Sequence, residues 1–423
     1  MLGLQIGALL FFLFLAVPVG FAIGISVLFY LGIDGRFPAD ILLQRSISGI
    51  SSFPMLALPL FIIVGYLMEL GSTPRLMRLA DAIFGRLPGG LAVANVGASA
   101  MFGTVSGSGI ATIAAVGGIM GPEMVRRGYP RGYTAALMAS TGGLGVIIPP
   151  SITLIIYGLA GNVSIGDLFL AAIVPGVVTA LIIAVAGLGS AWWCGYGTPR
   201  TASPKEIGTA FVQAIPPMLL PILILGGILG GVFTPTEAAA VGVAYAAFLS
   251  ALVYRELTLD KLPDILLKTI ITSATILIII AFSAALAWVI TINQLPALIG
   301  AWLVGVSDNP LVIFFLIQIV LLLLGTFMEP VPIIIITTPV FLPIVTGLGF
   351  DPLVYGMVLI INMIIGAMSP PVAVSIYTAA KIVNAKPSEV NYWMLLFIVP
   401  LLVAGVILSL IPELTTFLPN LAR

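Results

Sequence analysis

Four short stretches of the sequence combine glycine, hydroxyl side chains and paired prolines in a pattern that could bind a cation. Two of them, "GTVSGSG" (103–109) and "GTFMEPV" (325–331), are polar turns within apolar surroundings. The other two, "LGVIIPPSI" (144–152) and "IGAMSPP" (365–371), contain adjacent prolines. A proline lacks the backbone N–H and clashes with the carbonyl four residues earlier, which costs about 3 kcal/mol inside a helix. Paired prolines therefore free backbone carbonyl oxygens, and unwound carbonyls of this kind coordinate sodium in secondary transporters.

The same pair of elements occurs twice along the chain. The spacing from Gly103 to Gly145 is almost the same as the spacing from Gly325 to Gly366. Each later glycine precedes Pro-Pro by four residues, and the two copies are offset by 221 to 222 positions. A single Pro-Pro is explained equally well by a kink in a packed helix. Two copies in equivalent places favour a binding role, because repeated broken helices are the plan of many secondary transporters.

The amino-acid composition indicates that these elements lie in a lipid bilayer. Of the 423 residues, 60% are hydrophobic and only 8% are charged, which predicts an all-α polytopic membrane protein. The run from Met1 to Leu31 precedes the first charged residue, Asp34, and is predicted to be the first span rather than a cleaved signal. With one cysteine, Cys194, and no histidine, disulfide, zinc and redox chemistry are not expected.

The basic residues indicate the orientation of the chain. Thirteen of the 16 lysines and arginines fall in clusters between 75 and 386 that we place in the cytoplasm, and the exceptions are Arg36, Arg45 and Arg423. Segment 72–88 is then a cytoplasmic amphipathic arm, and 291–309 is an external arm. The stretch 89–123 begins and ends on the cytoplasmic side, so it is either two complete spans or one re-entrant hairpin. The second copy enters from the opposite side, and the repetition favours the hairpin.

The predicted fold has inverted repeats with two re-entrant helical hairpins and two broken helices. Its parts are scaffold helices and the cytoplasmic arm (1–88), the first hairpin and broken helix of a transport domain (89–165), scaffold helices, linker and external arm (166–310), the second hairpin and broken helix (311–390), and a C-terminal scaffold helix (391–423).

The sequence resembles the large membrane subunit of the tripartite ATP-independent periplasmic (TRAP) transporters over nearly its entire length. The resemblance is carried by "FGTVSGSGIATIAAVGGIM" (102–120), "GVIIPPSITLIIYG" (145–158), "GGVFTPTEAAAVGVAYA" (230–246) and "GTFMEPVPIIIITTPVFLPI" (325–344). It implies an elevator-type sodium symporter of the bacterial inner membrane that imports an organic anion, such as sialic acid or a C4-dicarboxylate. The implied partners are a periplasmic substrate-binding protein and a second, smaller membrane subunit, with membrane lipid around them and no nucleic acid.

Position by position, the resemblance also implies two sodium sites. The first consists of Gly103, Thr104, Ser106, Gly145, Ile148 and Pro149, and the second of Gly325, Thr326, Gly366, Ser369 and Val372. The second Pro-Pro departs from the family pattern, which more often has threonine at the position of Ser369 and glycine two residues after the pair. Serine keeps the hydroxyl, so a sodium site is still expected there.

Substrate is expected between the two hairpin tips. The candidate contacts are Ser108, Tyr157, Glu329 and Asn362. For Tyr157 and Asn362 the alternative is a hydrogen bond between packed helices, and for Glu329 it is a solvated turn. Glu237 is predicted instead to cap a helix that Thr234 or Thr236 opens.

Other functions fit the sequence less well. A self-sufficient sodium/dicarboxylate symporter without a binding protein is the main alternative. An intramembrane enzyme would need paired acids or a histidine, whereas Glu237 and Glu329 are isolated. A passive channel does not account for broken helices in inverted copies. A phosphate-binding loop is absent, so we expect coupling to an ion gradient rather than to a nucleotide. Because one sodium ion entering with a monovalent anion would be electrically neutral, we expect at least two sodium ions per anion.

Overall fold

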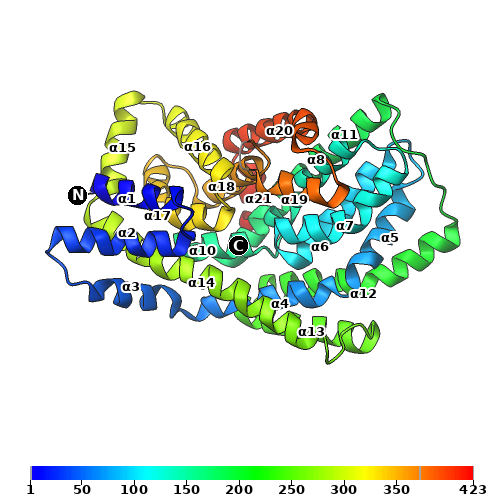
Figure 1. Ribbon diagram of the computed structural model, residues 1–423, viewed down its shortest axis with the longest axis horizontal. Helices are drawn as coiled ribbons and strands as arrows, with labels where there is room; N and C mark the ends of the chain where they lie inside the picture. The colour runs from blue at the N-terminus through cyan, green and yellow to red at the C-terminus, as the bar shows by residue number, and fades with distance from the viewer. Residues whose placement is uncertain (1, 371–372, 423) are drawn as a thin grey trace.

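The computed structural model describes residues 2–370 and 373–422, and this part of the chain is built from helices without strands (Figure 1). The helices are α1 (Leu2–Phe14), α2 (Val19–Asp34), α3 (Asp40–Ile50), η1 (Phe53–Leu56), α4 (Ala57–Glu69), α5 (Ser72–Phe84), α6 (Gly90–Ser106), α7 (Gly109–Arg126), α8 (Arg131–Gly142), α9 (Leu144–Ile147), α10 (Ile152–Gly161), α11 (Ile165–Trp193), α12 (Pro204–Leu229), α13 (Pro235–Phe248), η2 (Leu249–Val253), α14 (Leu262–Ile292), α15 (Leu295–Val306), α16 (Pro310–Phe327), α17 (Pro330–Gly347), α18 (Pro352–Ala367), α19 (Val374–Val383), α20 (Pro387–Leu410) and α21 (Glu413–Ala422). Among these described residues, seven helices are long and apolar enough to cross a membrane, or nine if each bent pair is one span.

The beginning of the chain differs from the prediction of one span over Met1 to Leu31. The structure has two helices there, α1 and α2, of 13 and 16 residues, and they pack against each other. Ala16 adopts a left-handed conformation with φ of 58°, and Pro18 precedes α2. The chain between α2 and the arm at 72–88 is also divided, since α3 and the η1–α4 segment meet at 70°. Hydropathy alone did not reveal the turn between α1 and α2 because the residues that form it are apolar.

The internal repeat is confirmed by the helix boundaries. The hairpins α6–α7 and α16–α17 correspond, and their second helices begin at Gly109 and Pro330, which matches the offset between the two copies in the sequence. The first residues of α10 and α19 show the same offset to within one position. Both of these helices end at an asparagine in the left-handed conformation, Asn162 with φ of 53° and Asn384 with φ of 51°.

Both predicted helix breaks are present. The α8–α9 segment and α10 meet at 48°, and residues 148–151 between them contain the first proline pair. In the second copy α18 ends at Ala367 and α19 begins at Val374. Residues 371 and 372 lie outside the described residues, so the predicted role of Val372 concerns a position that the structure does not describe.

The two copies of the repeat pack against each other at the centre of the molecule. Helix α10 of the first broken helix packs against α17 of the second hairpin, and α19 packs against α7 of the first hairpin. Figure 1 shows the hairpins on opposite sides of the centre, with α14 and α3 along one long edge. Each broken helix is therefore held by both hairpins.

The predicted arms are helices. The arm at 72–88 contains α5, which packs on α6 and α12, and the arm at 291–309 contains α15, which packs on α17. A cavity of about 500 Å³ separates α15 from the end of α17 and is lined mainly by apolar residues. The capping role of Glu237 is confirmed, because Thr234 and Glu237 form a reciprocal capping box at the start of α13.

Candidate functional site

The turn of the first hairpin lies directly on the backbone of the first helix break. A methyl group on Gly103 would be 2.9 Å from Cα of Gly145 and 3.1 Å from the carbonyl oxygen of Leu144. A methyl group on Gly145 would in turn contact the carbonyl oxygen of Ser108 at 2.7 Å. Only glycine permits two backbones to approach this closely.

The second copy repeats this contact with equivalent residues. A methyl group on Gly325 would lie 3.1 Å from Cα of Gly366, and one on Gly366 would lie 2.5 Å from Cα of Gly325. The glycines predicted for the two sodium sites therefore meet in pairs, one pair at each hairpin.

The two threonines that follow these hairpin glycines have the same hydrogen bond. Thr104 donates its hydroxyl proton to the carbonyl of Met101, and Thr326 donates to the carbonyl of Leu323, both at 2.7 Å. A hydroxyl that donates within its own helix keeps oxygen lone pairs free to accept. The oxygen of each threonine can therefore serve as a cation ligand.

A chain of hydroxyls closes the first hairpin turn and includes a residue that the sequence reasoning missed. Ser106 Oγ lies 3.2 Å from Thr112 Oγ1, and Thr112 donates to the carbonyl of Ser108 at 2.8 Å. Thr112 also faces Gly145 across the helix break. It lies four residues after Ser108, one helical turn along the same face, and this spacing was the signal that could have identified it.

The proline pair of the first break deprives two carbonyls, those of Gly145 and Val146, of their helical donors. The donor to the Gly145 carbonyl would be the nitrogen of Pro149, which has no proton, and the described residues provide no other. The Val146 carbonyl, deprived in the same way by Pro150, accepts from the Ser151 hydroxyl instead. A buried carbonyl with free lone pairs, beside threonine and serine oxygens, suits an ion that takes oxygen ligands. Ile148 extends across the break, and its N–H donates to the Leu144 carbonyl at 2.9 Å.

The second break is bonded differently. The Gly366 carbonyl accepts from the backbone N–H of Ser369 at 2.9 Å. The Ser369 hydroxyl donates to the carbonyl of Ile365 at 2.7 Å, so its oxygen keeps free lone pairs. The donor set again consists of carbonyls and a hydroxyl, and it fits the same class of ion.

Two of the substrate candidates occupy equivalent positions at the hairpin tips. Ser108 is the N-cap of α7 and accepts from the N–H of Ala111 at 3.4 Å, and Glu329 is the N-cap of α17. The Glu329 side chain is exposed and makes no capping hydrogen bond. Because the N-terminal end of a helix carries partial positive charge, both tips offer a favourable environment to an anion.

The other two candidates make hydrogen bonds within the protein. Tyr157 is fully buried and donates to the carbonyl of Pro352 at 2.6 Å, which joins α10 to α18. Asn362 donates to the carbonyl of Val358 in its own helix at 2.9 Å, and not to a neighbouring helix as the alternative proposed. Their contact with substrate stays a prediction.

We expect the Tyr157→Phe variant to be less stable without a change in sodium dependence. The change leaves the buried carbonyl of Pro352 without its donor, which costs about 1–3 kcal/mol. Thermal unfolding of the purified protein should show a lower midpoint. Tyr377→Phe is the matched control, because that ring is 51% exposed. A normal midpoint with weakened substrate transport would instead make Tyr157 a substrate contact.

Comparison with known proteins identifies relatives along almost the whole chain. The family model described as "Tripartite ATP-independent periplasmic transporter, DctM component" matches residues 6–414. An uncharacterized protein of Salmonella typhimurium, YgiK, is 38% identical over 98% of this chain and 96% of its own length. The C4-dicarboxylate TRAP transporter large permease protein DctM of Rhodobacter capsulatus is 33% identical over 98% of both chains.

Two further matches bear on the arrangement of the chain. The isethionate TRAP transporter permease protein DctMQ of Oleidesulfovibrio alaskensis is 35% identical over 96% of this chain, which spans 64% of that longer protein. The crystal structure of the Alcanivorax borkumensis YdaH transporter, described as having an unusual topology, aligns with a TM-score of 0.63 at 16% identity. That alignment covers 88% of this chain and 87% of the other, and it supports the fold.

Proposed function

The chain belongs to the DctM-component family of the tripartite ATP-independent periplasmic transporters, and on that premise we propose that it imports an organic acid anion by sodium symport. It is a multi-pass membrane protein with seven or more apolar helices in its described part. We place it in the bacterial inner membrane as the large subunit of the transporter.

The observation that carries the proposal is the pairing of each hairpin glycine with the glycine before a proline pair. Gly103 meets Gly145 and Gly325 meets Gly366, and the threonine that follows each hairpin glycine has a hydroxyl oxygen that can still accept. In hydrocarbon, freed backbone carbonyls need a partner, because lipid offers no hydrogen bonds. A sodium ion would supply that partner to the Gly145 carbonyl, and at both contacts an ion would hold a hairpin tip on a broken helix.

The proposed movement is of the elevator type. The two hairpins, taken as re-entrant, and the two broken helices would move together as a transport domain, while the remaining helices form the scaffold. The reciprocal packing of α10 on α17 and of α19 on α7 supports a single moving body. Substrate would lie between the tips, with the positive ends of α7 and α17 nearby.

The names of the relatives guide the substrate class and the partners. The relatives from Rhodobacter and Oleidesulfovibrio are named for C4-dicarboxylate and isethionate, which are both acid anions. The longer DctMQ protein indicates that a smaller subunit can be fused to a chain of this kind. We propose a separate small membrane subunit and a periplasmic binding protein as partners of this chain.

Reconstitution tests the proposal directly. We expect proteoliposomes that contain this chain and its small subunit to take up an organic acid only when sodium and the loaded binding protein are both outside. The matched control replaces sodium with choline at equal ionic strength. Sodium-driven uptake by this chain alone would establish the self-sufficient symporter, an alternative that the named relatives do not favour.

A further inference from the structure

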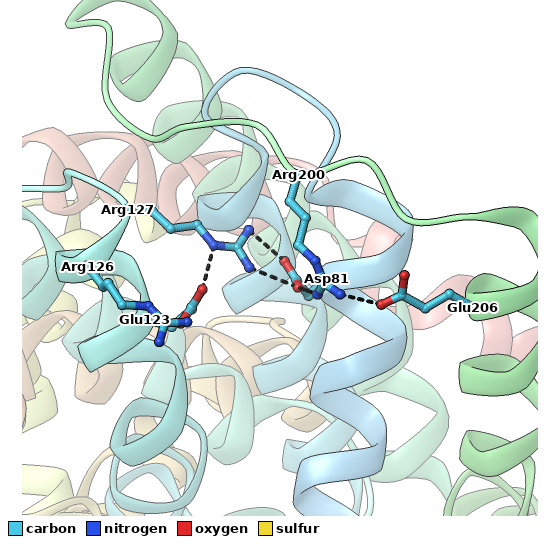
Figure 2. Close-up of polar contacts among 6 residues, drawn as sticks. All are labelled: Asp81, Glu123, Arg126, Arg127, Arg200 and Glu206. Atoms are coloured by element: carbon cyan, nitrogen blue, oxygen red, sulfur yellow. Dashed lines mark hydrogen bonds and ion pairs between the residues drawn. The ribbon is translucent and has the colours of Figure 1, made fainter.

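Six charged side chains meet where the arm helix α5, the end of α7 and the segment 195–206 come together (Figure 2). They are Asp81 of α5, Glu123, Arg126 and Arg127 at the end of α7, Arg200 of the segment, and Glu206 of α12. We call these six residues the charge cluster. Neither sodium site includes any of them.

Asp81 is the centre of the charge cluster. The Arg127 guanidinium donates to both oxygens of the Asp81 carboxylate at 3.1 Å, and Arg200 donates to one of them at 2.9 Å. The side chains of Arg127 and Asp81 are only 12% and 14% exposed, whereas Arg200 is 50% exposed. Burial alone would lower the pKa of Arg127, but Asp81 and Glu123 raise it above its usual value. The Arg127 guanidinium therefore stays charged, and both side chains of the pair are largely shielded from water.

The cluster divides into two groups along the proposed domain boundary. On the scaffold side, Arg200 bonds both Asp81 and Glu206, and these three side chains have a net charge of −1. On the hairpin side, Arg126 and Arg127 both pair with Glu123, and these three have a net charge of +1. The Arg127–Asp81 pair is the only side-chain bond between the two groups that the described residues form. One backbone bond, from Thr198 N–H to the Arg127 carbonyl at 3.1 Å, also crosses the boundary.

Each group stays paired if the two separate. Asp81 would keep Arg200, and Arg127 would keep Glu123 in its own helix at 2.6 Å. A buried ion pair that loses one partner normally leaves a costly uncompensated charge. Here separation leaves none, so the arrangement suits a contact that is made and broken repeatedly.

The second repeat has no counterpart of this contact. When α15 is aligned with α5, and α17 with α7, from their first residues, Asp81 corresponds to Val304 and Arg127 to Leu348. Both of these apolar residues line the cavity of about 500 Å³ between α15 and α17. Within residues 2–370 and 373–422, the ionic contact therefore joins α5 to the first hairpin and has no equivalent between α15 and α17.

We propose that the charge cluster is a one-sided latch, in which the Arg127–Asp81 pair holds the first hairpin against α5 in one end state of transport and opens in the other. The inference depends on the proposed movement of the hairpins relative to the scaffold. It predicts that the docked state is favoured over the undocked state, because only the docked state contains this pair.

Distances between two spin labels measure the two states without any substrate. The labels are attached to Leu259→Cys in the scaffold and Lys381→Cys in α19, in a Cys194→Ser background, with the full chain in lipid nanodiscs. Pulsed electron paramagnetic resonance should show one dominant distance in the parent protein. In Asp81→Asn and in Arg127→Gln, the population with a second distance should rise about tenfold relative to the population with the first distance. A change of this size lies within the usual range of coupling free energies between two sites.

Arg126→Gln is the matched control, because it removes the same charge from the same group without touching the bond that crosses the boundary. It should leave the distances unchanged. If Asp81→Asn does not fold, Arg127→Gln still decides, since Asp81 remains paired with Arg200 in that variant. Identical distances in all proteins would overturn the latch, and so would an equal shift in the Arg126 variant.

A covalent lock provides a second readout. Asp81→Cys and Arg127→Cys in the Cys194→Ser background, joined by a reducible cross-linker, should stop uptake in the reconstituted transporter, and reduction should restore it. Unimpaired uptake by the cross-linked protein would overturn the latch. If the parent protein shows no uptake at all, the proposed function fails, while the label distances still decide the latch.

Discussion

Replacing Gly366 with alanine is expected to weaken sodium binding at the second site about 5- to 150-fold. The added methyl group would lie 2.5 Å from both Cα and the carbonyl carbon of Gly325. These are backbone atoms, which cannot rotate away, so the hairpin must move off the broken helix. Overpacking of this kind costs about 1–3 kcal/mol, which corresponds to that range in an equilibrium constant.

Gly103→Ala should weaken the first site in the same way, because its methyl group would lie 2.9 Å from Cα of Gly145. The matched control is Gly118→Ala in α7, where a methyl group would meet nothing within 4 Å. Each variant is purified, and its thermal unfolding is followed while sodium is titrated against choline. If the Gly366 and Gly103 variants fold normally and respond to sodium as the parent does, the glycine pairs are not the ion sites.

The second large effect concerns the membrane potential. A potential of 100 mV contributes about 2.3 kcal/mol for each sodium ion that enters, so two ions contribute about 4.6 kcal/mol. Entry of a monovalent acid anion against the same potential costs about 2.3 kcal/mol. The remaining 2.3 kcal/mol corresponds to about 50-fold accumulation of the anion inside the vesicle. We therefore expect uptake of a monovalent acid to rise steeply when a potassium diffusion potential makes the vesicle interior negative.

Varying the external sodium concentration completes this test. The initial rate of uptake should depend on sodium with a Hill coefficient above one. Coupling to a single sodium ion would make entry of a monovalent anion electrically neutral. Uptake that ignores the potential, together with a Hill coefficient of one, would count against two sodium ions per anion.

The helix breaks were predictable from the sequence because proline acts locally. Pro149 and Pro150 interrupt a helix through their own missing protons, whatever surrounds them, and the break is found at that position. The divided first span was not predictable from hydropathy, because the turn between α1 and α2 consists of Leu15, Ala16, Val17 and Pro18. Because these turn residues are apolar, the hydropathy of the sequence does not show that the chain changes direction there.

The other features that could not be predicted from the sequence are contacts between residues far apart in the chain. Asp81 and Arg200 lie 119 positions apart, and both belong to basic or polar segments that predict an exposed surface. Thr112 looks like an ordinary hydroxyl inside a helix until the fold places it opposite Gly145. Tyr157 was recognised as polar and close to a break, but its partner, the Pro352 carbonyl, depends on the packing of α10 on α18.

The most direct test of sodium binding at the helix breaks is a pair of electron cryomicroscopy maps of the full chain in lipid, one in sodium chloride and one in choline chloride. We predict density in sodium, and none in choline, at two places: between the Gly103 turn and the break after Gly145, and between the Gly325 turn and the break after Gly366. Maps that match at both places, with the carbonyls bonded only to protein or water, would contradict the account.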